Sequence, residues 1–139
     1  MQDGIIIDSG AWTILVNPRH PSHARIRELA QGYINCLPTA VVGELFFGAF
    51  NQPERIEIRV REISNRLRPF RIIRPDLEIC SIWGQLMCQR KRDFGDTKVV
   101  KDYTDIWIAA TAIRWKFPVI TLNSKDFNWI NGLMVFSII

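Results

Sequence analysis

The chain has 139 residues, of which 47% are hydrophobic and 23% are charged, so it predicts one domain with a packed core and excludes a disordered chain. Its formal net charge of +4 is compatible with a polyanionic partner without establishing one. The three cysteines argue against a disulfide scaffold, and the lack of a basic-then-apolar leader or an apolar run of roughly 18–20 residues predicts a cytoplasmic protein outside the membrane.

Strands and helices alternate along the first half of the chain. The apolar run at 4–8 is too short for a helix and is typical of a buried central strand. Apolar residues repeat at spacings of three and four after this run, and this pattern predicts amphipathic helices. The elements expected here are the strand at 4–8, a helix at 11–16, a helix capped by Ser22, a brief strand at 34–37, a helix capped by Thr39, and a helix that Pro53 opens and that runs to about 66.

The second half continues the alternation. Its expected elements are a strand at 70–73, a long helix begun by Pro75 and Asp76, a basic loop at 89–101, a helix starting at Asp102, a strand at 119–122, a turn or short helix at 124–129, and a last strand at 133–138. Alternation of this kind predicts an α/β fold with a mostly parallel sheet covered on both faces. Ligands of such folds bind beyond the carboxyl ends of the strands.

Two acidic residues stand out in the first half. Asp8 ends the first strand, which places a carboxylate at the carboxyl end of the sheet, although a turn or cap role is the alternative. Glu44 is the only charged residue between Cys36 and Pro53, inside a helix that is apolar nearly all round. Burial of a lone carboxylate is costly, so a cation or a basic side chain is expected to compensate it, unless Glu44 lies on an exposed seam.

Two further acidic residues follow in the second half. Asp105 has the spacing of an N3 residue behind an N-cap at Asp102, so a structural role and a functional one are compatible. Asp126 comes shortly after the strand at 119–122, where a simple loop role is the alternative. Three or four carboxylates in one pocket repel one another, and divalent cations such as Mg²⁺ relieve that repulsion. No zinc-ligand spacing or phosphate-loop motif is present.

Four segments, in order, resemble the motifs of the PIN-domain family: IIIDSGAW, TAVVGELFFGAF, DYTDIWIAATAI and VITLNSKDF. The resemblance extends from near residue 4 to near residue 133. Within the family, the length and the ELFFGAF segment look most like the toxin subunits of VapBC toxin–antitoxin pairs. The resemblance implies a single PIN-like domain over 1–139, an α/β/α sandwich with a central, mostly parallel sheet. It also implies endonucleolytic hydrolysis of RNA phosphodiesters that depends on Mg²⁺ or Mn²⁺.

The resemblance also assigns roles. Asp8, Glu44 and Asp105 match the family's principal acids, and Asp126 is expected to complete the catalytic and metal-binding set, with Asn123 as the other candidate for the fourth place. Residues expected to support these acids are Ser9, Thr121, Asn123 and Asp102. Residues expected to hold the RNA backbone are Arg90, Lys91, Arg92, Lys98 and Lys101, with a solvated loop as the alternative.

Partners follow from the same resemblance. It implies a cognate antitoxin whose C-terminal segment lies across the active site, as well as a homodimer. The aromatic side chains of the third helix, Phe46, Phe47 and Phe50, are expected to supply part of the groove unless they belong to the core.

Two rival functions remain open at this point. One is another Mg²⁺-dependent phosphoesterase, although a DxD phosphatase motif is broken by Gly10. The other is a catalytically silent module that binds protein or RNA. The sequence does not identify the RNA target or the number of metal ions.

Overall fold

The computed structural model describes residues 3–95 and 103–138, which contain a five-stranded sheet in the order β3-β2-β1-β4-β5. All four strand pairs are parallel. The strands are β1 (Gly4–Ile7), β2 (Ile34–Pro38), β3 (Arg71–Ile73), β4 (Val119–Thr121) and β5 (Val135–Ser137). The predicted α/β fold with a parallel sheet is therefore confirmed, and β1 is its central strand.

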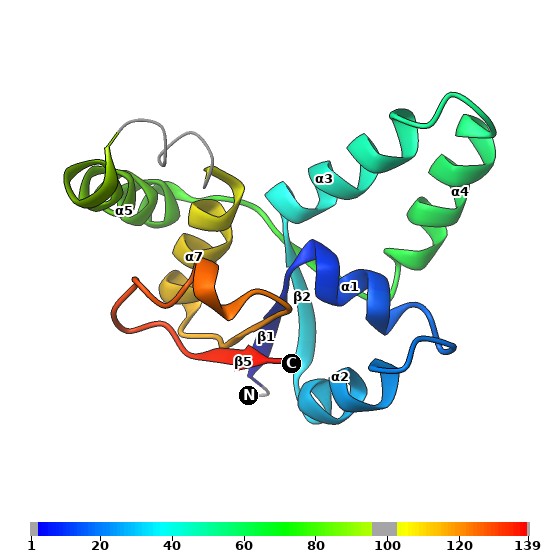
Figure 1. The fold of residues 1–139 in the computed structure, drawn as a ribbon, viewed down its shortest axis with the longest axis horizontal. Coiled ribbons are helices and arrows are strands. Elements are labelled where there is room, and N and C mark those ends of the chain that lie inside the picture. Colours follow the sequence, from blue (N-terminus) through cyan, green and yellow to red (C-terminus); the bar gives the residue numbers. More distant parts are fainter. Residues whose placement is uncertain (1–2, 96–102, 139) are drawn as a thin grey trace.

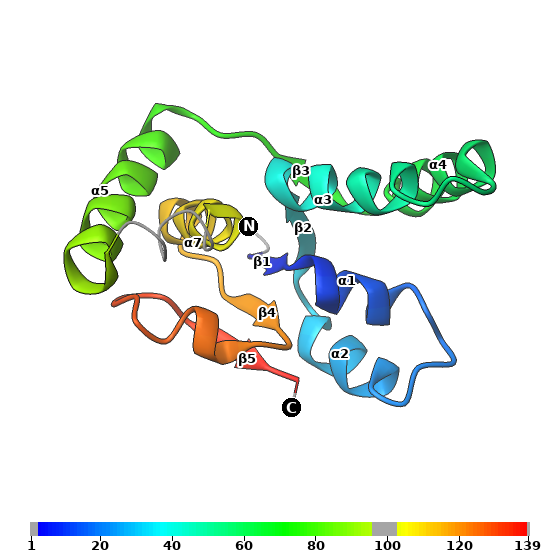
Figure 2. The ribbon, with the colours of Figure 1, turned by 45° about the horizontal axis from the view of Figure 1, so that its top comes forward.

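Helices cover both faces of this sheet. Within the described residues they are α1 (Ser9–Leu15), α2 (His23–Ala30), α3 (Thr39–Phe50), α4 (Ile56–Arg66), α5 (Leu77–Phe94) and α7 (Tyr103–Trp115), and a 3-10 turn, η1 (Ser124–Asp126), follows β4. Figure 2 shows α5 and α7 on one side of the sheet and α1 and α2 on the other. The helices α3 and α4 pack on each other and extend from one end of the sheet (Figure 1). None of the helices described is long and apolar enough to cross a membrane.

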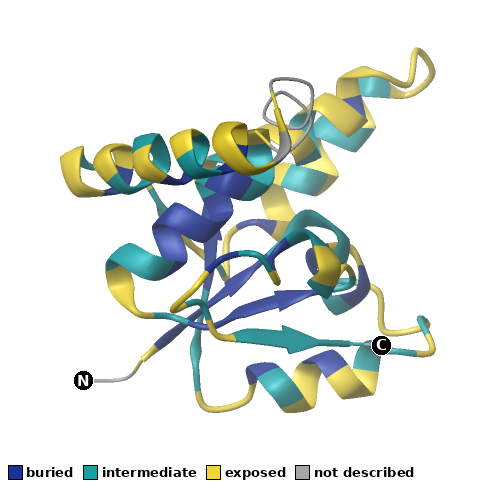
Figure 3. Cartoon of the chain, turned by 60° about the vertical axis from the view of Figure 1, so that its left-hand side comes forward, coloured by how far each residue is buried: buried dark blue, intermediate teal, exposed yellow. Residues whose placement is uncertain are grey.

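The core lies between the sheet and its helices, as the dark central strands of Figure 3 show. Ile5, Ile6 and Ile7 of β1 are fully buried, because both faces of a covered parallel sheet exclude solvent. On α7, Ala109 and Ala110 are also fully buried, and their small side chains let the helix approach the sheet closely. The outer faces of the helices are exposed.

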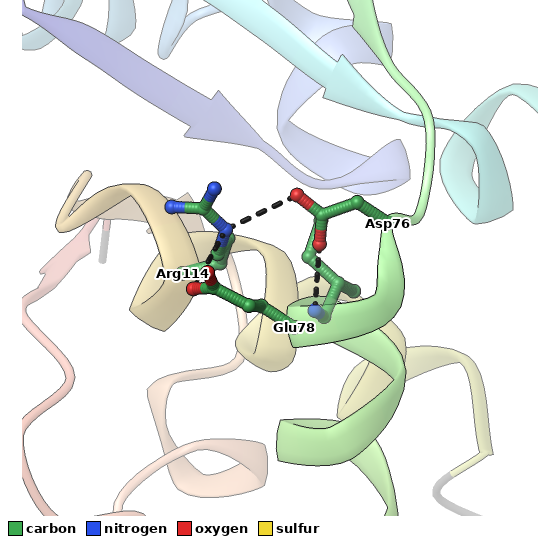
Figure 4. Close-up of polar contacts among 4 residues, drawn as sticks. Asp76, Glu78 and Arg114 are labelled. Carbon is green, nitrogen blue, oxygen red and sulfur yellow. Dashed lines mark hydrogen bonds and ion pairs between the residues drawn. The ribbon is translucent and has the colours of Figure 1, made fainter.

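An ion-pair cluster joins the beginning of α5 to the end of α7. The Arg114 Nε atom lies 3.1 Å from Asp76 Oδ2 and 3.1 Å from Glu78 Oε2 (Figure 4). The same Asp76 side chain accepts a hydrogen bond from the backbone N–H of Ile79 at 2.8 Å, which caps α5. This cluster holds the two helices together at the end of α7 that lies opposite its first turn.

The predicted starts of α3 and α4 are wrong. Thr39 is the first residue of α3 and not its cap, because its hydroxyl donates to the carbonyl oxygen of Ile73 at 3.0 Å, and Pro38 occupies the cap position. The helix expected from Pro53 begins at Ile56, because Arg55 adopts a left-handed conformation with φ of 63°. Both differences depend on contacts or backbone angles that local spacing does not encode.

The predicted basic loop is also wrong in its first half. Gln89 to Phe94 continue α5, which ends at Gly95 with φ of 84°. Gln, Lys and Arg are good helix formers, so a polar composition alone does not end a helix, whereas a left-handed glycine does. The rest of the expected loop, 96–101, lies outside the described residues.

Candidate active site

Asp8 lies where β1 passes into α1. Its carboxylate accepts a hydrogen bond from the backbone N–H of Ala11 at 2.8 Å and so caps α1, which is why that helix begins earlier than predicted. It also accepts a hydrogen bond from the hydroxyl of Thr121, a fully buried residue at the end of β4. Because β1 and β4 are parallel neighbours, the carboxyl ends of both strands meet here.

The carboxyl group of Asp8 is poorly solvated. Burial raises its pKa above the ordinary value, and the hydrogen bonds from Thr121 and Ala11 oppose that rise in pKa. The negative charge of Asp126 raises the pKa of Asp8 further. The structure thus brings these two acids, far apart in sequence, within electrostatic range of each other.

Glu44 lies in the first half of α3 and is exposed. The expectation that it is buried is therefore wrong, because α3 extends from the end of the sheet and buries Val41 and Ala49 but not the face that carries Glu44. Partial burial still raises the pKa of Glu44. The hydrogen bond that the Ser9 hydroxyl donates to the carboxylate lowers this pKa, and the negative charge of Asp8 raises it further. The hydrogen-bond partner of Glu44 is thus a hydroxyl group and not the expected basic side chain. Its exposure agrees with the alternative that Glu44 lies on an exposed seam of the helix.

Asp126 lies in η1, and a chain of hydrogen bonds connects this turn to the rest of the site. The backbone N–H of Asp126 donates to the carbonyl oxygen of Asn123 at 3.0 Å, and the N–H of Asn123 donates to Thr121 Oγ1 at 3.0 Å. The side chain of Asn123 is exposed. Of the two candidates for the fourth position, Asp126 is the one whose charge acts on Asp8.

Asp105 lies in the first turn of α7 and is half-buried. Because α7 packs against α3 and β1, it places Asp105 on an element that contacts the carriers of Asp8 and Glu44. Asp102, expected to support the acids, lies outside the described residues.

The four acids lie on elements that meet at one end of the sheet, but their side chains do not form a compact metal-binding cluster in the described residues. Within residues 3–95 and 103–138, no three Asp, Glu, His or Cys side chains lie close enough to hold one metal ion. Their donor chemistry nevertheless suits Mg²⁺ or Mn²⁺, since every donor is a carboxylate oxygen. Burial is the main cause of the raised pKa of Asp8 and of Glu44, and a neighbouring acid adds a smaller contribution to each pKa that a bound cation would oppose.

A groove begins at this acidic end and continues between α1, α3 and α4. Its volume is about 580 Å³, and its lining combines carboxylates, arginines and aromatic side chains. Lining residues include Ser9, Trp12, Glu44, Phe47, Arg59 and Arg66. Of the three phenylalanines expected at a groove, Phe47 lines it, Phe46 packs against the core, and Phe50 is exposed.

The predicted RNA-contacting residues are not equivalent. Arg90 is only 6% exposed, and its guanidinium carbon lies 4.5 Å from the ring centroid of Trp129, so the expectation that Arg90 holds an RNA backbone is wrong. Lys91 and Arg92 are exposed near the end of α5. Lys98 and Lys101 lie outside the described residues. Trp129 itself was not predicted, although its position three residues after Asp126 was a usable signal.

Comparisons with known proteins agree with the observed fold. Residues 5–131 match the family model described as PIN domain. DNA-bound VapBC from Salmonella typhimurium is similar, with 16% identity, 99% of each chain covered and a TM-score of 0.80. VapBC2 from Rickettsia felis, bound to a DNA fragment from its promoter, has 20% identity, with 96% of this chain and 97% of that chain covered and a TM-score of 0.77.

FitAcB from Neisseria gonorrhoeae is similar to the same degree, with 19% identity, 96% of this chain and 97% of that chain covered and a TM-score of 0.76. At such low identities these similarities show a shared fold. No match is found among curated protein sequences.

Proposed function

The chain belongs to the PIN-domain family, and on this basis we propose that it is a metal-dependent endoribonuclease that acts as the toxin of a toxin–antitoxin pair. The observation that carries the proposal is the placement of Asp8, Glu44 and Asp126 at the carboxyl end of the sheet, where Asp8 follows β1, Asp126 lies in the turn after β4, and Glu44 lines a groove with Ser9. The folds of the VapBC proteins, a family described as toxin–antitoxin systems, support the toxin part of the proposal.

In this proposal Asp8 and Asp105 hold a Mg²⁺ or Mn²⁺ ion, and Glu44 and Asp126 complete the acidic set. The cation supplies positive charge that stabilises the charge developing on the phosphoryl oxygens of RNA. Thr121 and Ser9 orient the carboxylates of Asp8 and Glu44 through their hydroxyl groups.

Glu44 is the best placed of these acids to accept a proton from an attacking water molecule. It is exposed, so water reaches its carboxylate, and an ionised carboxylate can accept a proton. The backbone of the RNA would contact exposed cations near the acidic end, for which Lys91 and Arg92 are candidates.

The antitoxin is proposed to place an extended segment in the groove between α1, α3 and α4. Phe47 offers an apolar contact there, and Glu44 and Glu62 offer carboxylates that a basic side chain of the segment would neutralise. An occupied groove would cover Ser9 and Glu44, so RNA would lose access to that side of the site. Binding there would therefore inhibit cleavage.

The first experiment is incubation of a pool of structured RNAs with purified protein in Mg²⁺, in Mn²⁺ and in EDTA. We expect discrete cuts that require a cation and that decrease at least about 100-fold in Asp8→Asn, because a direct ligand should contribute no less than a supporting residue does. Asp76→Asn is the matched control, since Asp76 caps α5 at the same 2.8 Å distance but does not belong to the acidic set.

Folded protein, free of any inhibitor, that makes no cation-dependent cuts would contradict the nuclease proposal and favour the silent binding module. Hydrolysis of a small phosphoester in place of RNA would favour the other phosphoesterase. Equal losses in Asp8→Asn and Asp76→Asn would show that the aspartate at the start of α1 matters for folding alone.

A further inference from the structure

We propose that Trp129 and Arg90 are positioning residues that hold the turn carrying Asp126, and so set the place of the fourth acid. The inference rests on the proposed function, because it takes Asp126 as part of the acidic set. It goes beyond that function by giving roles to two side chains that are not part of the proposed acidic set.

The first contact joins Trp129 to the backbone of the acid. The indole Nε1–H of Trp129 donates to the carbonyl oxygen of Asp126 at 2.9 Å. Phe127, 1% exposed, and Ile130, 6% exposed, anchor the same turn in the core. Because Phe127 is buried and the carbonyl oxygen of Asp126 accepts a hydrogen bond from the indole, the backbone that directs the Asp126 side chain has little freedom.

The second contact joins Trp129 to α5. The guanidinium carbon of Arg90 lies 4.5 Å from the ring centroid, which is within the range of a cation–π interaction. Arg90 is only 6% exposed, so its guanidinium group is stabilised by the groups that pack on it, and the indole face of Trp129 is one of them. The stack fixes the plane of the ring, and with it the direction of the Nε1–H bond towards Asp126.

A second stack of the same kind provides an internal comparison. Arg114 lies 4.4 Å from the ring centroid of Trp115, at the end of α7. Trp115 is 43% exposed and lies at the opposite end of α7 from Asp105. A role that is merely structural should make the two stacks respond alike to substitution, whereas a positioning role should separate them.

The test compares Trp129→Phe, which keeps a ring for the cation but lacks the indole N–H, with the matched control Trp115→Phe. Arg90→Met removes the charge, and Arg90→Lys restores it. For each full-length variant, Mn²⁺ affinity is measured by titration calorimetry, the Mg²⁺ concentration for half-maximal RNA cleavage is measured, and the Tm is recorded. Asp126→Asn and the double variant that combines it with Trp129→Phe complete a double-mutant cycle for Mn²⁺ affinity.

We expect Trp129→Phe and Arg90→Met to weaken Mn²⁺ binding about tenfold, and to raise the Mg²⁺ requirement to a similar extent, with partial recovery in Arg90→Lys. Trp115→Phe should leave Mn²⁺ affinity unchanged. Because Trp129 acts through Asp126, Trp129→Phe should add no loss of affinity in the Asp126→Asn background.

Unchanged Mn²⁺ affinity in Trp129→Phe would overturn the inference, as would full additivity with Asp126→Asn or equal losses in Trp115→Phe. Protein that binds no Mn²⁺ would overturn it together with the metal-dependent function. Wild-type protein that binds Mn²⁺ without cutting RNA would contradict the nuclease proposal alone, while weaker Mn²⁺ binding by Trp129→Phe would still support the positioning role.

Discussion

Asp8 and Asp76 occupy the same position relative to the helix that each precedes. Each accepts a backbone N–H at 2.8 Å, from Ala11 and Ile79 respectively. Their surroundings nevertheless move their pKa values in opposite directions. Burial raises the pKa of Asp8, whereas the hydrogen bond from Ile79, with help from Arg114, lowers the pKa of Asp76. The same helix-capping motif therefore contains a carboxylate whose charge is destabilised by burial at Asp8 and one whose charge is stabilised by its partners at Asp76.

This contrast predicts opposite pH dependences of stability in metal-free protein. A raised pKa means that the folded state binds the proton of Asp8 more tightly, so the carboxylate costs stability as the pH rises above about 4. Asp8→Asn should therefore increase the free energy of unfolding at pH 7, with a smaller gain at low pH. Asp8→Ala should be about 1 kcal/mol less stable than Asp8→Asn, because alanine does not cap α1.

Asp76→Asn is the control of opposite sign. A lowered pKa means that its carboxylate adds stability at neutral pH, and that this stability is lost as the pH falls through the lowered value. Asp76→Asn should therefore be less stable than wild type at pH 7. Urea denaturation between pH 3 and pH 7 in EDTA would measure both effects, and a destabilised Asp8→Asn at pH 7 would refute the account of its burial.

Gly4 in β1 and Gly84 in α5 lie in different surroundings. At the start of β1, a Cβ atom on Gly4 would lie 2.5 Å from Phe117 Cε2, so the missing side chain lets this ring pack against the strand. In the interior of α5, a Cβ atom on Gly84 would have nothing within 4 Å. The first glycine is needed for packing between elements, and the second only adds flexibility to a helix.

Substitution by alanine should therefore have opposite effects at these two positions. Gly84→Ala should increase the free energy of unfolding by about 1 kcal/mol, because alanine favours the helix. Gly4→Ala should decrease it by about 1–3 kcal/mol, because the Phe117 ring must move in a packed region. Equilibrium urea unfolding measures both, and an unchanged stability of Gly4→Ala would show that the ring is displaced at no cost.

At the scale of the whole molecule, α3 and α4 extend away from the sheet as a pair (Figure 1). No residue of α4 is buried, and on α3 the side chains of Phe47 and Phe50 are 68% and 58% exposed. Large exposed aromatic side chains on one helix are typical of a surface that contacts another protein. Because the sequence resemblance implies a homodimer, we propose that the part of this surface around Phe50, beyond the groove, joins two copies of the chain.

Phe50→Ser should accordingly weaken a homodimer by about tenfold or more, because burying a phenylalanine contributes about 1.5–3 kcal/mol. Light scattering coupled to size-exclusion chromatography over a range of concentrations would measure the dissociation. Leu77→Ser is the control, since Leu77 is 88% exposed at the start of α5. Wild-type protein that is monomeric, or a dimer that only Leu77→Ser disrupts, would rule out this surface.

Local patterns in the sequence were sufficient for the parallel sheet and for the elements on which three of the candidate acids lie. An apolar strand that ends in Asp8, a strand followed by Asp126 and a helix that begins near Asp105 each contain their information within a few neighbouring residues. Because parallel strands share one carboxyl edge, the topology then predicts where these acids lie.

Tertiary structure alone decided the environment of each side chain. Glu44 is exposed because α3 projects from the sheet, and Arg90 is buried because the turn after β4 brings Trp129 to α5. Both outcomes depend on contacts between residues that are far apart in the chain, and periodicity within one helix contains no information about them. Solvation and pairing of a charge are properties of its whole surroundings, so they are decided only when the elements pack together.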